Sequence, residues 1–525
     1  MAKQTNDNLP DDIEALKQLV LAQQDVLEIS QRNNRSQQAT IKLLEEKIKL
    51  FQQRQFGKSS EKSDQQAELF DEAELESTDD TKLLAEILAD TPEEKSEKSK
   101  AKPGRKKLPQ DLPRIRIVHD LPEHEKACAC GCQKTFIGED TSEQLDIIPA
   151  VVQVLVHVRN KYACKQCESG VATAPLPPQP FAKSNASPGL LAHVAVAKYQ
   201  DGLPLYRMEA IFKRYGLHIP RNTLANWMIK STEILQPLYN LLNDQLLSGN
   251  YIHMDETRVQ VLKEPDKKAE SLSYMWVRRN GVLDYPIVLF DYASSRRGEV
   301  VESLLGDYQG YLQTDDYVGY HRYGQREGVE HLGCFAHARR KFVEAQKVTP
   351  SKKGKVSKAD MAVNFIKVLY RIESEIKDLS ADEKYLIRQK KSIPQLTKLR
   401  NWLDNALQKT LPKGKTGEAL SYLDKNWLKL SAYTNNGILN IDNNPVENAI
   451  RPFAIGRKNW MFSDSQSGAK ASAMLYSIIE TAKANGLEPY HYLRTLFTRL
   501  PSCETLEDFE KLLPWQVELE ELLKF

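Results

Sequence analysis

The stretch "YIHMDETRVQVL" (residues 251–262) has the apolar content of a buried strand, yet it carries two adjacent acids near its centre. Burying an ionised carboxylate costs free energy unless a nearby group compensates for the lost water. Alternation along a strand points Asp255 and Glu256 to opposite faces of a sheet. The fold must therefore supply a partner for at least one of these carboxylates.

The sequence that follows predicts a sheet around this strand. A ribonuclease-H-like α/β core has three meandering strands, a crossover helix and a fourth strand that lies beside the first. Asp255 is in the first strand and Asp315 ends the fourth, so this order would bring them together. The expected elements are strands at 273–280 and 285–291, a helix near 296–306 and a strand at 310–315.

A third acid is expected from a helix in "IDNNPVENAIRPFAIGRKNW" (residues 441–460). Asn444 can cap that helix, and Pro445 suits its first position. Glu447 then falls in the first turn, where the helix dipole stabilises negative charge. Glu447 is therefore the best candidate to join Asp255 and Asp315.

Converging carboxylates require a cation. Two of them about 4 Å apart repel by about 4 kcal/mol at an effective dielectric near 20. Oxygen ligands suit Mg²⁺ or Mn²⁺, and two such ions can clamp the attacking and leaving oxygens of a phosphoryl displacement. The simpler readings are that Asp255 is a strand-end acid and that Glu447 pairs with Arg451 one turn later. Asp316 is next to Asp315 and could be mistaken for the active acid, but it lies beyond the end of the expected strand.

A cysteine-rich module is expected at residues 113–182. Two cysteine knuckles flank alternating, strand-like sequence, as in a zinc ribbon that holds structural Zn²⁺. Four ligand positions on the zinc ion are available to five cysteines, because either Cys128 or Cys132 could join Cys130 in the first knuckle. The alternative to a zinc site is a small β module whose cysteines are reduced thiols. The candidates are Cys128, Cys130, Cys132, Cys164 and Cys167. Cys334 and Cys503 are isolated and expected to be structural.

Residues 183–245 have helix-turn-helix spacing. Ser187 and Pro188 begin one helix, "PLYRMEAIFKRYG" forms another that ends at Gly216, and "RNTLANWMIKSTEIL" begins the next. The start of that last helix carries side chains that can reach bases or phosphates. Helix pairs of this kind also occur without DNA. The candidate contacts are Arg221, Asn222, Thr223 and Asn226.

The N-terminal region (residues 1–56) contains a seven-residue apolar repeat at 13–51, which predicts a two-stranded coiled coil. Its central seam is polar, so a helix hairpin within one chain is the alternative. Residues 57–112 predict a disordered linker with segregated charge. Residues 68–80 carry seven acids, and residues 95–107 carry seven bases. Arg105 in "KPGRKK" suits a narrow minor groove.

The sequence lacks the patterns of membrane-spanning, secreted and phosphate-loop proteins. No apolar run approaches the roughly 20 residues that cross a bilayer, and the N-terminus lacks the apolar core of a secretion signal. We therefore expect a cytoplasmic protein, associated with the nucleoid if it binds DNA. "GKT" at 414–416 lacks the earlier glycine of a phosphate loop, where Lys409 stands instead.

The sequence resembles the insertion-sequence-66 family of bacterial transposases along nearly its whole length. The motifs that carry the resemblance are "FGKSSEK" (56–62), "CACGC" with "KYACKQC" (128–132 and 161–167), "HMDET" (253–257), "LQTDDYVGY" (312–320), "GCFAHARRKF" (333–342), "DNNPVENAIRPFAIGRKNWMF" (442–462) and "LLPW" (512–515). Many members have glycine at the position of Asp316 and arginine at that of Asn448.

The resemblance implies a DDE transposase with a ribonuclease-H-like catalytic domain at 246–480, a helical insertion at about 350–435 and a helical tail at 481–525. Asp255, Asp315 and Glu447 would hold two Mg²⁺ or Mn²⁺ ions for DNA cleavage and strand transfer. The zinc module and the helix pair would recognise transposon ends. Further DNA contacts would come from His337, Arg339, Arg340, Lys341, Arg451, Arg457, Lys458 and Trp460.

The same resemblance implies partners besides DNA. The coiled coil would pair two protomers, and small accessory transposition proteins are often encoded beside family members. Two other functions stay open from the sequence: a non-catalytic DNA-binding regulator of transposition, and a general ribonuclease-H-like nuclease. These three functions differ in whether the carboxylates are needed and in whether transposon ends are preferred.

Overall fold

The computed structural model describes residues 152–163, 171–281, 285–348 and 356–517, together with Arg116 and scattered positions between 12 and 48. The five cysteines predicted to bind zinc, and Arg105, lie outside the described residues. The described positions between 14 and 48 are helical, including Ser30 and Asn34 in the polar centre of the repeat. The seam residues described there expose more than half of their surface: Leu27, Ile41, Leu44 and Ile48.

A mixed sheet organises the part of the chain from residue 176 onward. Its order is β5-β4-β3-β6-β7, with β8 paired to the far end of β3. β3, β4 and β5 are antiparallel, whereas β6 and β7 run parallel to β3. The strands are β3 (Tyr251–Lys263), β4 (Leu272–Asn280), β5 (Val288–Ala293), β6 (Gly310–Gln313), β7 (Val329–Leu332) and β8 (Ser463–Ser465). The first four agree with the sequence prediction; β7 and β8 were not predicted.

Different helices cover the two faces of this sheet. On one face, Phe290 of β5 packs against Phe453 and Tyr476, which come from α14 (Asn444–Trp460) and α15 (Gln466–Ala484). On the other face, Arg278 of β4 donates to Asn243 and to the Leu304 carbonyl. That face is covered by α5 (Arg221–Ser248), α6 (Gly298–Leu305) and α7 (Val318–His321).

The structure contains the helix pair that the sequence predicts in the segment preceding the sheet. The Ser187 hydroxyl accepts from the Leu190 amide at 3.2 Å and so caps the helix that Pro188 begins. Gly216, at φ 79°, takes the left-handed conformation that ends the next helix. The helices are α3 (Pro188–Tyr199) and α4 (Leu205–Arg214), with α5 following; α3 also packs against α16 (Pro489–Arg499).

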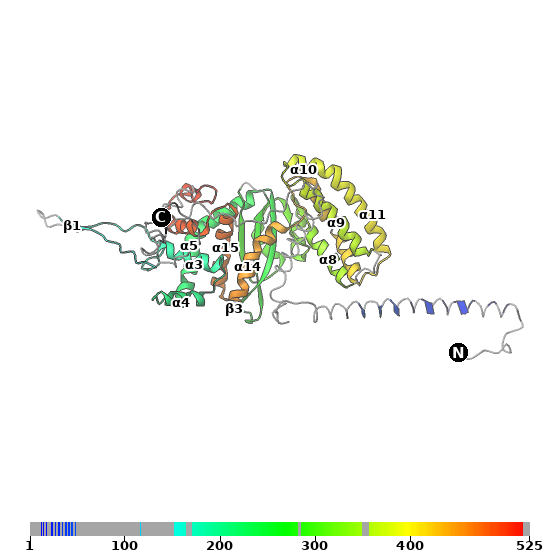
Figure 1. Ribbon diagram of the computed structural model, residues 1–525, viewed down its shortest axis with the longest axis horizontal. Helices are drawn as coiled ribbons and strands as arrows, with labels where there is room; N and C mark the ends of the chain where they lie inside the picture. The colour runs from blue at the N-terminus through cyan, green and yellow to red at the C-terminus, as the bar shows by residue number, and fades with distance from the viewer. Residues whose placement is uncertain are drawn as a thin grey trace, which may run out of the picture. The chain divides into compact units, whose positions relative to one another are not determined.

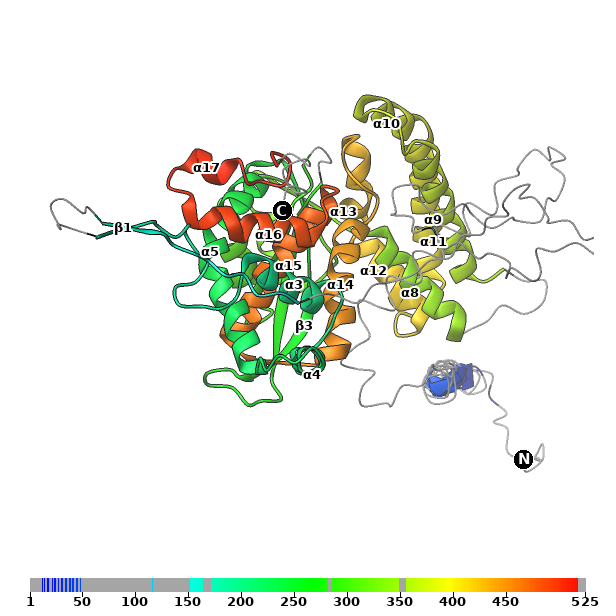
Figure 2. The same cartoon turned by 60° about the vertical axis from the view of Figure 1, so that its left-hand side comes forward.

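A helical unit occupies the chain between β7 and α14. Helices α8, α9, α11 and α12 stand together in it (Figures 1 and 2). The interior that they share consists mainly of leucine and alanine side chains. The helices are α8 (Phe335–Val348), α9 (Lys358–Glu375), α10 (Ala381–Ile387), the π-helix η4 (Arg388–Ser392), α11 (Ile393–Gln408), α12 (Lys415–Lys425), α13 (Trp427–Ser431) and the 3₁₀-helix η5 (Ala432–Asn435).

The remaining described elements are short. They are the hairpin β1 (Lys161–Ala163) and β2 (Val171–Thr173), and η3 (Tyr323–Gln325), η6 (Leu500–Ser502) and α17 (Leu506–Glu510). Among the described helices, none has the length and apolar character needed to cross a membrane.

Candidate active site

Two of the predicted acids stand at the same end of neighbouring parallel strands. The ladder between β3 and β6 ends with the pair His253 and Gln313. Asp255 lies two residues further along β3, and Asp315 lies two residues beyond the end of β6. Paired strands lie about 4.8 Å apart, and the charges of both aspartates help to raise the pKa of the same side chain, Tyr320. The strand order therefore brings together two acids that are distant in sequence.

The third acid reaches this end of the sheet through the start of α14. The Asn443 side chain lies 2.9 Å from His253 Nδ1 and donates to the Met254 carbonyl at 3.1 Å. The Glu447 amide donates to the Asn443 carbonyl at 3.3 Å, which places Glu447 in the first turn. The prediction that Asn444 caps the helix was wrong by one residue. Asn443 occupies the cap position, and its side chain bonds β3 instead of the helix.

Glu447 is buried, with three side chains around its carboxylate. The Cys334 thiol donates to Oε1 at 3.9 Å, and His337 Nδ1 lies 3.5 Å from the same oxygen. Arg340 lies 4.0 Å from Oε2. His337 and Arg340 were predicted to contact DNA, but here both face the acid. Cys334 was expected only to be structural; its Cys-x-x-His spacing at the start of α8 is the signal that could have placed it in the site.

Glu256 lies on the opposite face from Asp255, as strand alternation predicts. It forms a salt bridge with Arg296 and accepts a hydrogen bond from the Tyr320 hydroxyl. The pKa of Glu256 is raised to about 7, mainly by burial and secondly by the negative charge of Asp315. The pKa of Tyr320 is also raised, first by burial and then by Glu256, Asp255 and Asp315. The carboxylates therefore concentrate negative potential at this end of the sheet.

This donor set was tested against the divalent ions that the sequence predicts. Asp255, Asp315 and Glu447 offer oxygen atoms alone, which suits Mg²⁺ or Mn²⁺. Among the residues that the structure describes, one group has ligand atoms all within 4.8 Å of one another: Cys334, His337 and Glu447. The three acids are spaced more widely than that. The chemistry of these donors therefore fits Mg²⁺ or Mn²⁺.

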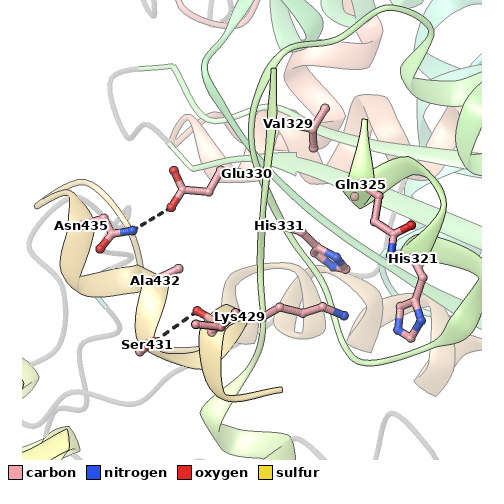
Figure 3. A pocket seen from close by; sticks show the side chains of 11 residues that line it. His321, Gln325, Val329, Glu330, His331, Lys429, Ser431, Ala432 and Asn435 are labelled. Atoms are coloured by element: carbon pink, nitrogen blue, oxygen red, sulfur yellow. Dashed lines mark hydrogen bonds between the residues drawn. The ribbon is translucent and has the colours of Figure 1, made fainter. Parts of the chain in front are cut away.

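Asp316 has different neighbours. His321 Nε2 lies 3.0 Å from its Oδ1, and Lys429 Nζ lies 3.6 Å from the same oxygen. Both residues line a cavity of about 550 Å³ between β7 and the α13–η5 segment. Figure 3 shows His321, His331 and Lys429 in it, with Asn435 bonded to Glu330 at the other side. Asp316 is therefore paired with the Lys429 ammonium and the His321 ring.

The remaining predicted DNA contacts differ in exposure. Arg221, Asn222 and Asn226 are exposed at the start of α5, and Thr223 is half-buried. The half-buried residues elsewhere are Arg339, Arg451 and Lys458. Lys341 is exposed, with its ammonium 4.7 Å from the centre of the Tyr422 ring.

One predicted DNA contact, Arg457, is corrected by the structure, and a second, Trp460, has intramolecular partners. Arg457 is buried, and its Nη1 donates to Thr257 at 3.1 Å and to the Arg258 carbonyl. It therefore fixes α14 to β3 instead of facing DNA. The Trp460 ring packs edge-on against Phe453, and Lys198 lies over it at 5.4 Å. These contacts cover part of a ring that is half-buried, and its contact with DNA stays a prediction.

Comparison with protein families gives four matches along the chain. The "Transposase IS66 family" matches residues 183–471, and the "IS66 C-terminal element" matches 477–515. The "zinc-finger binding domain of transposase IS66" matches residues 125–168, which contain the five cysteines. "Transposase C of IS166 homeodomain" matches residues 43–117.

Similar curated proteins come from Sinorhizobium fredii (strain NBRC 101917 / NGR234) and are described as uncharacterized. The protein y4jD is 34% identical over 78% of this chain and 81% of its own length. The protein y4qI is 31% identical over 97% of both chains. No solved structure matches.

Proposed function

The chain belongs to the transposase IS66 family, and on that premise we propose that it cleaves transposon ends and joins them to target DNA. Asp255, Asp315 and Glu447 are the proposed catalytic acids, on a ribonuclease-H-like core. One observation carries this proposal: β3 and β6 are parallel neighbours, and Asn443 fastens the start of α14 to β3 at the same level. This arrangement is expected where three dispersed acids act together.

The three acids would hold two Mg²⁺ or Mn²⁺ ions. When bound, such ions activate the attacking oxygen and stabilise the leaving oxygen of the displacement. Within the chain itself, the β3–β6 ladder orients the two aspartates. The buried pair of Asn443 and His253 fixes the helix that carries Glu447. Burial lowers the pKa of His253 to about 3, so this imidazole stays neutral and adds no charge beside the acids.

DNA recognition would come from separate parts of the chain. Exposed Arg221, Asn222 and Asn226 begin a helix, where the backbone dipole also favours phosphate. The cysteine-rich module would hold structural Zn²⁺ through four of its five cysteines and assist in recognising the ends. Self-association through the N-terminal helix would hold two DNA ends in one complex, because the exposed apolar seam can pair with a second copy.

The test uses the purified full-length chain, Mg²⁺ and labelled transposon-end DNA. Asp315→Asn should lower cleavage by about 10³-fold or more, because several kcal/mol of transition-state stabilisation is lost. Asp316→Asn is the matched control and should retain cleavage, since Asp316 faces His321 and Lys429. Both variants should still shift end DNA on a gel.

The outcomes separate the three functions. Binding of end DNA by the wild type without cleavage would favour the non-catalytic regulator. Equal cleavage of end DNA and unrelated duplex would favour a general nuclease. Full cleavage by Asp315→Asn would remove the acid from the catalytic set and overturn the proposed mechanism.

A further inference from the structure

We propose that Cys334, His337 and Glu447 form a second kind of metal site, selective for a thiophilic ion such as Zn²⁺ and distinct from the oxygen-only site for Mg²⁺. Occupation of this site would withdraw Glu447 from the two aspartates. The ion site itself follows from the donor geometry; its inhibitory effect rests on the proposed function.

The donor atoms already have nearly the required separations. Zn²⁺ binds sulfur at about 2.3 Å and nitrogen or oxygen at about 2.0–2.1 Å, so tetrahedral geometry puts sulfur and oxygen about 3.5 Å apart. The observed distance from Cys334 Sγ to Glu447 Oε1 is 3.9 Å. His337 Nδ1 lies 3.5 Å from the same oxygen, against about 3.3 Å in a tetrahedron. Each of these two separations is within about half an ångström of its tetrahedral value, and the sulfur and the imidazole nitrogen lie within 4.8 Å of each other.

The donor types select the ion. A thiolate, an imidazole and one carboxylate oxygen are the mixed set that Zn²⁺ accepts, whereas Mg²⁺ favours oxygen ligands in octahedral geometry. Binding would release the thiol proton to solvent, as metal coordination by cysteine requires. The two sites thus share Glu447 but differ in every other ligand.

The backbone holds this cysteine in place. The Asn443 amide donates to Cys334 Sγ at 3.2 Å, and such a donor stabilises charge on the sulfur. The Phe335 amide donates to the Ile441 carbonyl at 3.2 Å, which joins the start of α8 to the segment before α14. Arg340 approaches Glu447 through Oε2, so it leaves the Oε1 side of the carboxylate to the cysteine and histidine.

Binding is tested with Co²⁺ as a spectroscopic probe on the full-length chain whose cysteine-rich module is already loaded with zinc. The wild type should show a thiolate-to-cobalt charge-transfer band that is absent in Cys334→Ser. Cys503→Ser removes a thiol outside the cluster and should keep the band. Thermal unfolding of each variant checks that it is folded, and His337→Gln should weaken Co²⁺ binding by at least about 10–100-fold.

The inhibitory effect is tested by titrating Zn²⁺ into Mg²⁺-dependent cleavage of end DNA. Each rate is divided by the rate of the same variant without added Zn²⁺. The concentration giving half-inhibition should rise by at least about 10-fold in Cys334→Ser and stay unchanged in Cys503→Ser.

The two readouts keep this proposal separate from the proposed function. A Cys334-dependent band in a protein that does not cleave DNA would support the ion site and overturn the proposed transposase mechanism. Identical cobalt spectra for folded wild type and Cys334→Ser would overturn the ion site, whatever the cleavage activity.

Discussion

The sheet region and the helical unit between β7 and α14 are both well packed, but their interiors differ in chemistry. The sheet buries polar and charged groups, including His253, Arg278 and Gln313, each held by hydrogen bonds. The helical unit is filled mainly by leucine and alanine, with Arg388 as a charged exception. Buried polar groups stabilise a fold less than apolar ones, so their concentration beside the three acids marks the region that positions chemistry.

The two regions also differ in the range of their contacts. Helices α9, α11 and α12 bury faces that follow a local repeat, whereas the β3–β6 ladder joins distant stretches. The helical unit can therefore change without disturbing the carboxylates, provided that its ends stay joined to the sheet. Three measurements test this difference between the two regions.

The largest expected stability effect is in the sheet. Arg278 is buried and forms a 2.8 Å salt bridge with Asp291, with further bonds to Asn243 and the Leu304 carbonyl. Arg278→Ala should lower the free energy of unfolding by about 3–5 kcal/mol, because it leaves Asp291 without its buried cation. Urea denaturation measures this. The exposed Arg322, paired with Glu302, is the control and should lose at most about 1 kcal/mol as Arg322→Ala.

In the helical unit, Leu399 of α11 is fully buried. Leu399→Ala should cost about 2–5 kcal/mol through lost burial and the resulting cavity. Cleavage per folded molecule should stay unchanged at low temperature, since the sheet is intact. Leu428→Ala, at a side chain that is 83% exposed, serves as the control. A large loss of cleavage in folded Leu399→Ala protein would contradict the independence of the two regions.

The smallest effect concerns Glu256. Its pKa in the fold, about 7, is above its ordinary value of 4.5, so the fold favours the protonated acid. This stabilising contribution is complete below about pH 4.5 and is lost as pH rises through 7. The wild type should therefore lose about 1–3 kcal/mol more stability than Glu256→Gln between pH 5 and pH 8.

Chemical denaturation at both pH values tests the Glu256 effect, with the exposed Glu270→Gln as a control that should keep the wild-type slope. Mg²⁺ should reduce the difference, because a cation near Asp315 favours ionised Glu256. Equal slopes for wild type and Glu256→Gln would show that burial and the charge of Asp315 do not favour the protonated form of Glu256.

Much of the sheet could be predicted from sequence, because alternation, turn residues and the order of elements are local signals. They placed β3, β4, β5 and β6 and separated Asp255 from Glu256. The four-residue strand "VEHL" was missed because it is too short to show a repeat and because, unlike the equally short β6, it had no place in the expected order of elements. The three-residue strand β8 was missed for the same reason.

The surroundings of Glu447 could be predicted only in part. Its place in a first turn follows from Pro445, but the cap residue Asn443 is diverted by bonds to β3, and Arg457 is buried by contacts to the same strand. The approach of Cys334 depends on the turn between β7 and α8. These partners are more than a hundred residues from Glu447 or from β3, so no local pattern contains them.

Helix α14 is attached to β3 at both of its ends. Asn443 bonds Met254 before the helix, and β8, directly after it, pairs with Val261 and Lys263. The position of the helix is therefore fixed at both ends relative to the strand that carries Asp255. Asp315, beyond the last paired residue of a short strand, lacks such an attachment. If DNA binding adjusts the spacing of the acids, the hinge should lie on the Asp315 side.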